Sequence, residues 1–154
     1  MDVIRNNVKR LDGIAQLQFL LDAGVQPSIG RTLGFSLVEI EKGRAVFAGE
    51  PGRHLYNPIG VVHGGYAATL LDSACGCAVH TMLSASQGYT TLELKVSYHR
   101  PLSDSSGLVK AEGRILSFGR RAAFAEAKLT DAAGKLYASA TSTLLVFEVK
   151  AEAR

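Results

Sequence analysis

Apolar residues recur at three- and four-residue steps near the beginning of the chain, which predicts an amphipathic helix over about residues 7–23. The positions that carry this pattern are Val8, Leu11, Ile14, Leu17, Leu20 and Leu21. Gly24 is a stop signal for the helix, and residues 26–30 are expected to form a connector. Residues 1–29 are therefore predicted to be an N-terminal helix and connector.

Six later segments carry the alternating or short apolar pattern typical of β-strands. They cover residues 32–41, 44–49, 90–99, 108–116, 121–130 and 136–147. In the third of these, the alternation places Leu92, Leu94, Val96 and Tyr98 on one face. Turn signals follow several of the strands: Lys42 with Gly43, residues 103–107 and residues 131–134. Consecutive strands joined by short turns favour an antiparallel sheet and an α+β fold.

Residues 63–83 follow an irregular loop over residues 50–60 and are almost free of charge, with Asp72 as their one carboxylate. The length invites a transmembrane reading, but His63, Gly64, Gly65, His80 and Asp72 would be costly in lipid. A helix that is apolar on most sides is more often buried in a protein core. Its many alanines and glycines would let a sheet wrap closely around it.

Composition places the chain among single globular domains, here residues 1–154. Of the 154 residues, 47% are hydrophobic and 20% are charged, which excludes disorder and a disulfide-stapled scaffold. Cys75 and Cys77 are too close in sequence for an easy bridge, and no signal peptide is recognised, so a cytoplasmic location is predicted. The net charge of +3, with no basic run longer than Arg120-Arg121, favours a small anionic ligand over nucleic acid.

Two glycines, Gly64 and Gly65, open the long helix. The first N–H groups of a helix have no intrahelical partner, and with the helix dipole they favour negative charge. A glycine lets a ligand approach those groups, so an oxyanion would suit this place. The alternative is that the glycines only permit a tight turn into the helix.

Asp72 lies in the middle of this helix with no Lys or Arg in residues 63–83. A buried carboxylate without a partner costs several kcal/mol, so either it serves a purpose or a hydroxyl such as that of Thr69 or Ser73 satisfies it. Asp72 is eight residues after Gly64, about 12 Å along a helix axis. If both serve one reaction, they come from two copies of the chain, which predicts a symmetric dimer with sites at its interface.

The run His63-Gly64-Gly65, six further residues and then Asp72 resembles the hotdog-fold acyl-CoA thioesterases of the phenylacetic-acid-degradation type. Asn57, the stretch from Thr91 to Pro101, the stretch from Ser117 to Arg121 and residues 131–136 resemble further blocks of that family in the same order. The resemblance covers most of the chain after Leu33. It implies a hotdog fold, in which an antiparallel sheet wraps a long central helix.

The resemblance also implies roles for individual residues. Asp72 would be the nucleophile or general base, and Gly65 of the partner subunit would donate its N–H to the thioester carbonyl. His63, Asn57 and Thr91 would orient the substrate or the water. Coenzyme A would be bound by Gly64, Glu93, Tyr98, Ser117, Phe118, Gly119, Arg120, Arg121 and Ala122, with the two arginines at its phosphates. The family further implies a homodimer that assembles into a tetramer, with no cofactor besides the acyl-CoA substrate.

The sequence also allows other functions and site types to be considered. No pair of His and Cys has zinc-type spacing, and no Gly-x-Ser-x-Gly motif is present, so a metal site or a serine nucleophile is not expected. The two helix cysteines have nothing to lower their pKa. The arginine pair could be only a solvated turn. A non-catalytic acyl-CoA binding protein and a hotdog-fold hydratase or dehydratase remain as alternatives, and a purely structural module would leave Asp72 unexplained.

Overall fold

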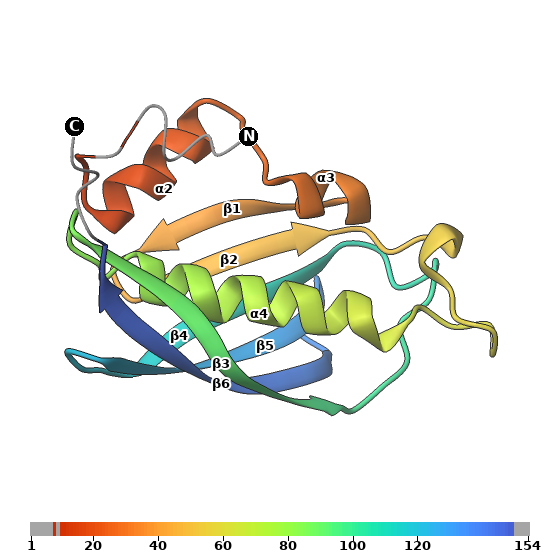
Figure 1. Ribbon diagram of the computed structural model, residues 1–154. Coiled ribbons are helices and arrows are strands. Elements are labelled where there is room, and N and C mark those ends of the chain that lie inside the picture. The colour runs from red at the N-terminus through yellow and green to blue at the C-terminus, as the bar shows by residue number, and fades with distance from the viewer. Residues whose placement is uncertain (1–7, 9, 150–154) are drawn as a thin grey trace.

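A long helix lies across one face of a six-stranded antiparallel sheet in the computed structural model, which describes residue 8 and residues 10–149. The helix is α4 (Gly64–His80), and the sheet curls around it (Figure 1). The strand order is β1-β2-β4-β5-β6-β3, so β1 and β3 form the two edges. This arrangement confirms the predicted α+β class and the hotdog fold.

All six predicted strands are present, with their ends shifted by a few residues. They are β1 (Phe35–Glu41), β2 (Arg44–Gly49), β3 (Gln87–Tyr98), β4 (Val109–Phe118), β5 (Ala122–Asp131) and β6 (Leu136–Glu148). Every neighbouring pair is antiparallel. A short 3-10 helix, η1 (Arg53–Leu55), lies in the loop that leads from β2 to α4.

The N-terminal region differs from the prediction in two ways. Helix α2 (Gly13–Asp22) starts later than expected because Asp12 caps it, accepting a hydrogen bond from the Ala15 N–H; residues 7 and 9 lie outside the described residues. Part of the predicted connector and the start of the predicted first strand form a second short helix, α3 (Ser28–Leu33). Gly34 ends α3 in the left-handed conformation, with φ of 72°, and turns the chain into β1.

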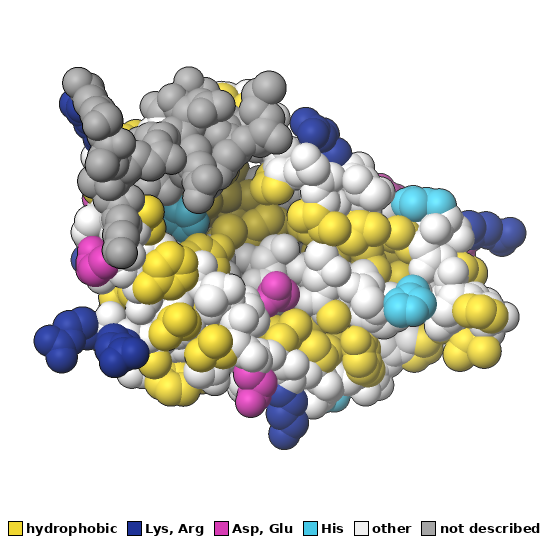
Figure 2. All heavy atoms as spheres, in the orientation of Figure 1, with side chains coloured by type: hydrophobic (Ala, Val, Ile, Leu, Met, Phe, Trp, Pro, Cys, Tyr) yellow, Lys and Arg dark blue, Asp and Glu magenta, His cyan; other side chains and the backbone are white. Residues whose placement is uncertain are grey.

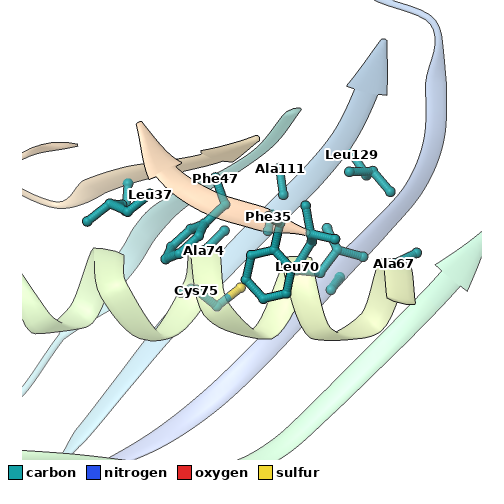
Figure 3. Packing of buried hydrophobic residues seen from close by; sticks show 14 of the residues in the cluster. Phe35, Leu37, Phe47, Ala67, Leu70, Ala74, Cys75, Ala111 and Leu129 are labelled. Atoms are coloured by element: carbon teal, nitrogen blue, oxygen red, sulfur yellow. The ribbon is translucent and has the colours of Figure 1, made fainter. Parts of the chain in front are cut away.

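Small and apolar side chains fill the contact between α4 and the sheet (Figure 3). Leu70, Ala74 and Cys75 are fully buried against strands β1, β2, β4 and β5. The approach is so close that a Cβ at position 113 of β4 would overlap the Ala74 carbonyl, which explains the glycine there. Full burial of one such leucine contributes about 1.5–3 kcal/mol to folding. None of the described helices is long and apolar enough to cross a membrane.

Strand β3 pairs with β6 along one side only and carries a bulge between Thr91 and Glu93. Before the bulge, Thr91 faces α4, and after it Leu94 and Val96 pack on the core. The extra residue leaves Leu92 61% exposed. The predicted apolar face of this strand is therefore right for Leu94 and Val96 and wrong for Leu92.

Candidate functional site

The first turn of α4 is capped by the side chain of His63. Its Nδ1 accepts a hydrogen bond from the Gly65 N–H at 2.8 Å, and the His63 carbonyl accepts one from the Tyr66 N–H at 2.9 Å. A Cβ at position 65 would lie only 2.9 Å from Nδ1, so a glycine lets the imidazole ring reach its capping position. Because Nδ1 accepts, the neutral ring carries its proton on Nε2, which becomes a donor toward whatever lies beyond the helix end.

This cap changes the prediction for the glycine pair. The Gly65 N–H, expected to be free for an oxyanion, is already donated to His63. Among the hydrogen bonds between described residues, none is donated by the Gly64 N–H. The free backbone donor at the start of α4 is therefore Gly64, with Gly65 serving to seat the histidine.

Asn57 holds the loop that leads into α4. Its Oδ1 accepts hydrogen bonds from the N–H groups of Ile59 and Val61 at 3.2 and 3.3 Å, and its own N–H donates to the Val61 carbonyl at 2.8 Å. The side-chain oxygen is thus committed to the loop. The Nδ2 amide group is the part of Asn57 that is left to donate to a ligand.

Four of the predicted site residues meet around one pocket of about 310 Å³ at the N-terminal end of α4: Asn57, His63, Gly64 and Tyr98. The Tyr98 hydroxyl donates to the Gly64 carbonyl at 2.9 Å, which ties the end of β3 to the start of the helix. Much of the remaining wall is apolar and includes Val62, Ala67 and Leu102. The pocket thus combines an apolar recess with donors at its rim, as ligand sites commonly do.

Asp72 is partly buried, and its partner is Thr91. The Thr91 hydroxyl donates to Oδ1 of Asp72 at 3.0 Å. Of the two hydroxyls that the sequence offered as partners, that of Thr69 donates instead to the Gly65 carbonyl at 2.8 Å. No ion pair among the described residues includes Asp72. A hydroxyl therefore fixes one carboxylate oxygen, and no cation neutralises the group.

The face of α4 that carries Asp72 is not covered by the sheet. Its residues are small or polar and are partly exposed: Gly64, Gly65, Ala68, Thr69, Asp72, Ser73 and Cys77. On this side of the molecule an acidic side chain lies in the middle, between apolar and uncharged groups (Figure 2). The donors at the helix start remain about 12 Å from Asp72 along the axis, too far for one chain to apply both to the same carbonyl.

The predicted coenzyme A residues do not gather in one place within the chain. Arg120 and Arg121, in the β4–β5 turn, line a separate pocket of about 430 Å³. Residues 145–148 of β6 form the rest of its wall. Because β6 there pairs with the start of β3, this pocket lies at the opposite end of the sheet from the α4 N-terminus. Gly119 donates its N–H to the Ala122 carbonyl at 2.8 Å and so closes the turn.

Three other predicted residues line neither the arginine pocket nor the pocket at the start of α4. Phe118 is partly buried and packs against the core at the end of β4. Ser117 is exposed and pairs with Phe124 of β5. Glu93 is exposed at the β3 bulge and lines neither pocket.

The two cysteines are free thiols on α4. Burial raises the pKa of Cys75 and of Cys77 to about 12 each, with the charge of Asp72 adding to the effect. Neither is a thiolate at neutral pH, so a cysteine nucleophile is not available here.

One contributor to the site was not predicted. Asp104 accepts hydrogen bonds from the Tyr56 hydroxyl at 2.8 Å and from Nε of Arg53 at 2.7 Å. These contacts hold the loop of Asn57 against the segment that follows β3. In the sequence Asp104 is recognisable only as part of a turn. Its partners Arg53 and Tyr56 are 51 and 48 residues away along the chain, so the sequence pattern could not reveal these contacts.

Comparison with known proteins identifies thioesterases and related hydrolases as relatives of this chain. Residues 59–138 match the thioesterase superfamily. A 1,4-dihydroxy-2-naphthoyl-CoA hydrolase of Listeria monocytogenes is 28% identical over 115 residues, 75% of this chain and 92% of that protein. A variant of the phenylacetic acid degradation protein PaaI from Thermus thermophilus superposes with a TM-score of 0.70 at 29% identity, covering 77% of this chain and 98% of that one.

A Streptococcus mutans protein solved with acetyl-CoA bound superposes with a TM-score of 0.68 at 25% identity, covering 77% of this chain and 92% of that one. These similarities confirm the resemblance that the histidine, glycine and aspartate spacing indicates. The chain belongs to the thioesterase superfamily, a family of thioester hydrolases with the hotdog fold.

Proposed function

We propose that this protein hydrolyses an acyl-CoA thioester to a carboxylic acid and free coenzyme A, at sites formed between two copies of the chain. The observation that carries the proposal is Asp72, a carboxylate without a cationic partner among the described residues, held by Thr91 on the uncovered face of α4. The named relatives support the substrate class, since one is a naphthoyl-CoA hydrolase and another was solved with acetyl-CoA.

The open edge of β3 supports the proposed dimer. The middle part of this strand contacts Asp72 through Thr91, and its C-terminal end contacts Gly64 through Tyr98. If β3 pairs antiparallel with β3 of a second copy about an axis between these two positions, Thr91 of one strand lies beside Tyr98 of the other. Each Asp72 then approaches the helix start of the partner. A two-fold axis produces two equal sites and also covers an otherwise open edge.

Within such a site, donors from one subunit hold the thioester carbonyl. The Gly64 N–H lies at the positive end of the helix dipole, and His63 keeps Nε2–H as a donor while its Nδ1 is occupied. The Nδ2 group of Asn57 is a third donor on the same pocket. Such fixed donors stabilise the negative charge that develops on the carbonyl oxygen.

The carboxylate of the other subunit supplies the reacting group. As a general base, Asp72 removes a proton from water, the hydroxide adds to the carbonyl carbon, and the carbon–sulfur bond breaks to release the coenzyme A thiolate. As a nucleophile, it adds to the carbonyl carbon itself, and water then hydrolyses the acyl-aspartate anhydride. Both routes need an ionised Asp72 with one free oxygen, which the single hydrogen bond from Thr91 leaves.

Coenzyme A is expected to lie along residues from Ser117 to Ala122, with Arg120 and Arg121 at its phosphates. Both arginines are exposed and share a pocket, and their planar groups suit phosphate oxygens. Tyr98 is expected to border the thioester, and Glu93 to reach the coenzyme only at its outer part. No further cofactor is expected.

The test is release of free thiol from phenylacetyl-, benzoyl-, hydroxybenzoyl- and straight-chain acyl-CoA. Asp72→Asn should lower kcat by about 10²–10⁴-fold, the usual contribution of a general base. Asp22→Asn, which alters an acid at the end of α2, is the control and should leave the rate unchanged. A loss below tenfold in Asp72→Asn would refute the assigned role. Binding of coenzyme A without any hydrolysis would instead establish a non-catalytic acyl-CoA binding protein.

A further inference from the structure

Tyr89 lies on the inner face of β3, in the same row of side chains as the partner of Asp72. It pairs with Val146 of β6, is partly buried and packs against the core. Thr91, two residues later, points to the same face and donates its hydroxyl hydrogen bond to Asp72. The start of β3 lies beside the C-terminal half of α4, and its end lies beside the helix start (Figure 1).

A glycine on α4 makes room for the ring of Tyr89. A Cβ at position 76 would lie 3.1 Å from both Cε2 and the hydroxyl oxygen of Tyr89, closer than side chains usually approach. Gly76 is four residues after Asp72, about 6 Å along the helix axis. The phenol ring therefore borders the uncovered face of α4 about one helical turn beyond the carboxylate.

Two further groups support this ring from behind. The His80 ring meets it edge to face, with the centroids 5.6 Å apart. Nε2 of His80 is hydrogen-bonded in turn to Oε1 of Gln16 in α2 at 2.9 Å. Helix α2 approaches α4 so closely that a Cβ at position 13 would overlap the His80 carbonyl oxygen. Helix α2 thus fixes His80, and His80 keeps the ring of Tyr89 in place.

The ring presents an uncharged surface to the uncovered face of α4. Burial raises the pKa of the Tyr89 phenol, and the nearby Cys77 thiol and Asp72 carboxylate raise it further. The hydroxyl therefore keeps its proton at neutral pH. A neutral aromatic ring suits an apolar acyl group, whereas the phosphates of coenzyme A need cations.

In the proposed two-chain site, Tyr89 meets the pocket of the other subunit. The proposed pairing of the β3 strands puts Thr91 beside Tyr98 of the partner subunit. Two residues further along, it puts Tyr89 beside Arg100 of the partner subunit. Tyr98 and Arg100 both line the pocket of about 310 Å³ at the start of α4. The apolar wall of that pocket and the ring of Tyr89 therefore come together from two chains.

We propose that Tyr89 forms the end wall of the acyl pocket and limits the acyl group to about the size of one aromatic ring. This inference rests on the proposed function and on its two-chain site. The thioester carbonyl carbon lies at Asp72, so an acyl group that extends along α4 meets the ring after about 6 Å. A benzoyl or short straight-chain acyl group fits this length, and a long straight chain does not.

The experiment measures dissociation constants of non-hydrolysable thioethers of coenzyme A by isothermal titration calorimetry. The probes S-methyl-, S-benzyl- and S-octyl-CoA differ only in the group that would enter the acyl pocket. Dividing each value by that for S-methyl-CoA removes the contribution of the coenzyme. Because binding is measured and not hydrolysis, the result does not depend on the role of Asp72.

Two variants should change the selectivity in opposite directions. Tyr89→Ala removes the wall, so the affinity for S-octyl-CoA relative to S-methyl-CoA should rise about tenfold or more, the usual effect of room for a further methylene group. Gly76→Ala pushes the ring away from α4 and into the pocket, so the relative affinity for S-benzyl-CoA should fall. Alanine favours a helix more than glycine does, so the second variant should retain its fold.

Two controls separate the ring from the strand that carries it. Tyr89→Phe keeps the ring, and Leu92→Ala alters an exposed residue of β3 on the opposite face; both should keep the wild-type ratios. The proposal is overturned if Tyr89→Ala keeps the wild-type ratio for S-octyl-CoA, or if Tyr89→Phe shifts it as much. If Tyr89→Ala does not fold, as judged by thermal melting, Gly76→Ala decides, and an unchanged ratio for S-benzyl-CoA overturns the proposal.

The outcomes for the pocket and for the proposed function are distinct. Shifted ratios in a protein that hydrolyses no acyl-CoA would support the wall at Tyr89 and refute the proposed function. Hydrolysis that depends on Asp72, together with unshifted ratios, would refute the wall alone.

Discussion

Replacement of Thr91 by valine removes one hydroxyl group and little else, because the two side chains have nearly the same shape and both favour strands. The hydroxyl donates to Oδ1 of Asp72 at 3.0 Å, across 19 residues of sequence. If this contact orients the carboxylate, its loss will leave Asp72 free to rotate. The variant should then bind substrate normally but react more slowly.

The expected size follows from the hydrogen bond. A bond to a charged group contributes about 1.5–3 kcal/mol, and the lower end applies because Asp72 is partly exposed to water. If about 1.5 kcal/mol is fully expressed in the transition state, kcat falls roughly tenfold. The Michaelis constant should stay within about twofold, since the hydroxyl holds the reacting group and not the substrate.

The assay is steady-state thiol release with the best acyl-CoA, with thermal melting to verify folding. Thr91→Ser is the matched control, because serine keeps the hydroxyl on the same Cβ, and it should retain most of the wild-type kcat. The reasoning is refuted if Thr91→Val has the wild-type kcat, or if Thr91→Ser loses as much activity as Thr91→Val.

Three further predictions concern the helix cap, a buried histidine and the arginine pair. Gly65→Ala places a Cβ 2.9 Å from Nδ1 of His63, so it should displace the cap and lower the free energy of unfolding by about 1 kcal/mol, measured by urea denaturation. Burial lowers the pKa of His80 from its ordinary 6.5 to about 4, so the folded protein holds this ring neutral. The free energy of unfolding is therefore not reduced by His80 above about pH 6.5, and it falls by up to roughly 3 kcal/mol as the pH falls toward 4, because protonation of this ring then favours the unfolded chain. His80→Gln should remove that part of the pH dependence of unfolding. Arg120→Ala with Arg121→Ala should raise KM for acyl-CoA and leave kcat nearly unchanged, whereas an unchanged KM would make the pair a solvated turn.

The pattern of apolar residues predicts most of the fold, because α4 and the six strands are long enough for their periodicities to stand out. Helix α3 could not be found this way: it has six residues, too few to show a helical period, and contains Gly30. The bulge in β3 could not be predicted from the sequence for a different reason. Leu92 continues the sequence alternation, and only the pairing with β6 shows that it turns outward.

The candidate site could be predicted as a set of residues but not as a set of contacts. Asp72 lies eight residues after Gly64 on the same helix, too far for both to act on one carbonyl group. This spacing is visible in the sequence, and it favours a site shared by two chains. Which hydroxyl meets Asp72 depends on how β3 lies against α4, and Thr91 was expected only near the water. The His63 cap depends on one side-chain rotamer, which the sequence does not show. Because of this cap the Gly65 N–H is already hydrogen-bonded, and the Gly64 N–H is the donor left for a ligand.

The most direct test of the two-chain site is a mixture of two variants, each of which is expected to lose most of its activity alone because it lacks one side chain of the proposed site. Asp72→Asn lacks the carboxylate, and His63→Ala lacks the imidazole on the opposite half of the site. Unfolding the two together and refolding them at equal concentrations gives mixed dimers in which one of the two sites is fully wild type. Because half of the dimers are mixed, thiol release should recover to about a quarter of the wild-type rate if each site takes Asp72 and His63 from different chains. A mixture that stays as inactive as the two separate variants would show that both residues act within one chain and would contradict the account.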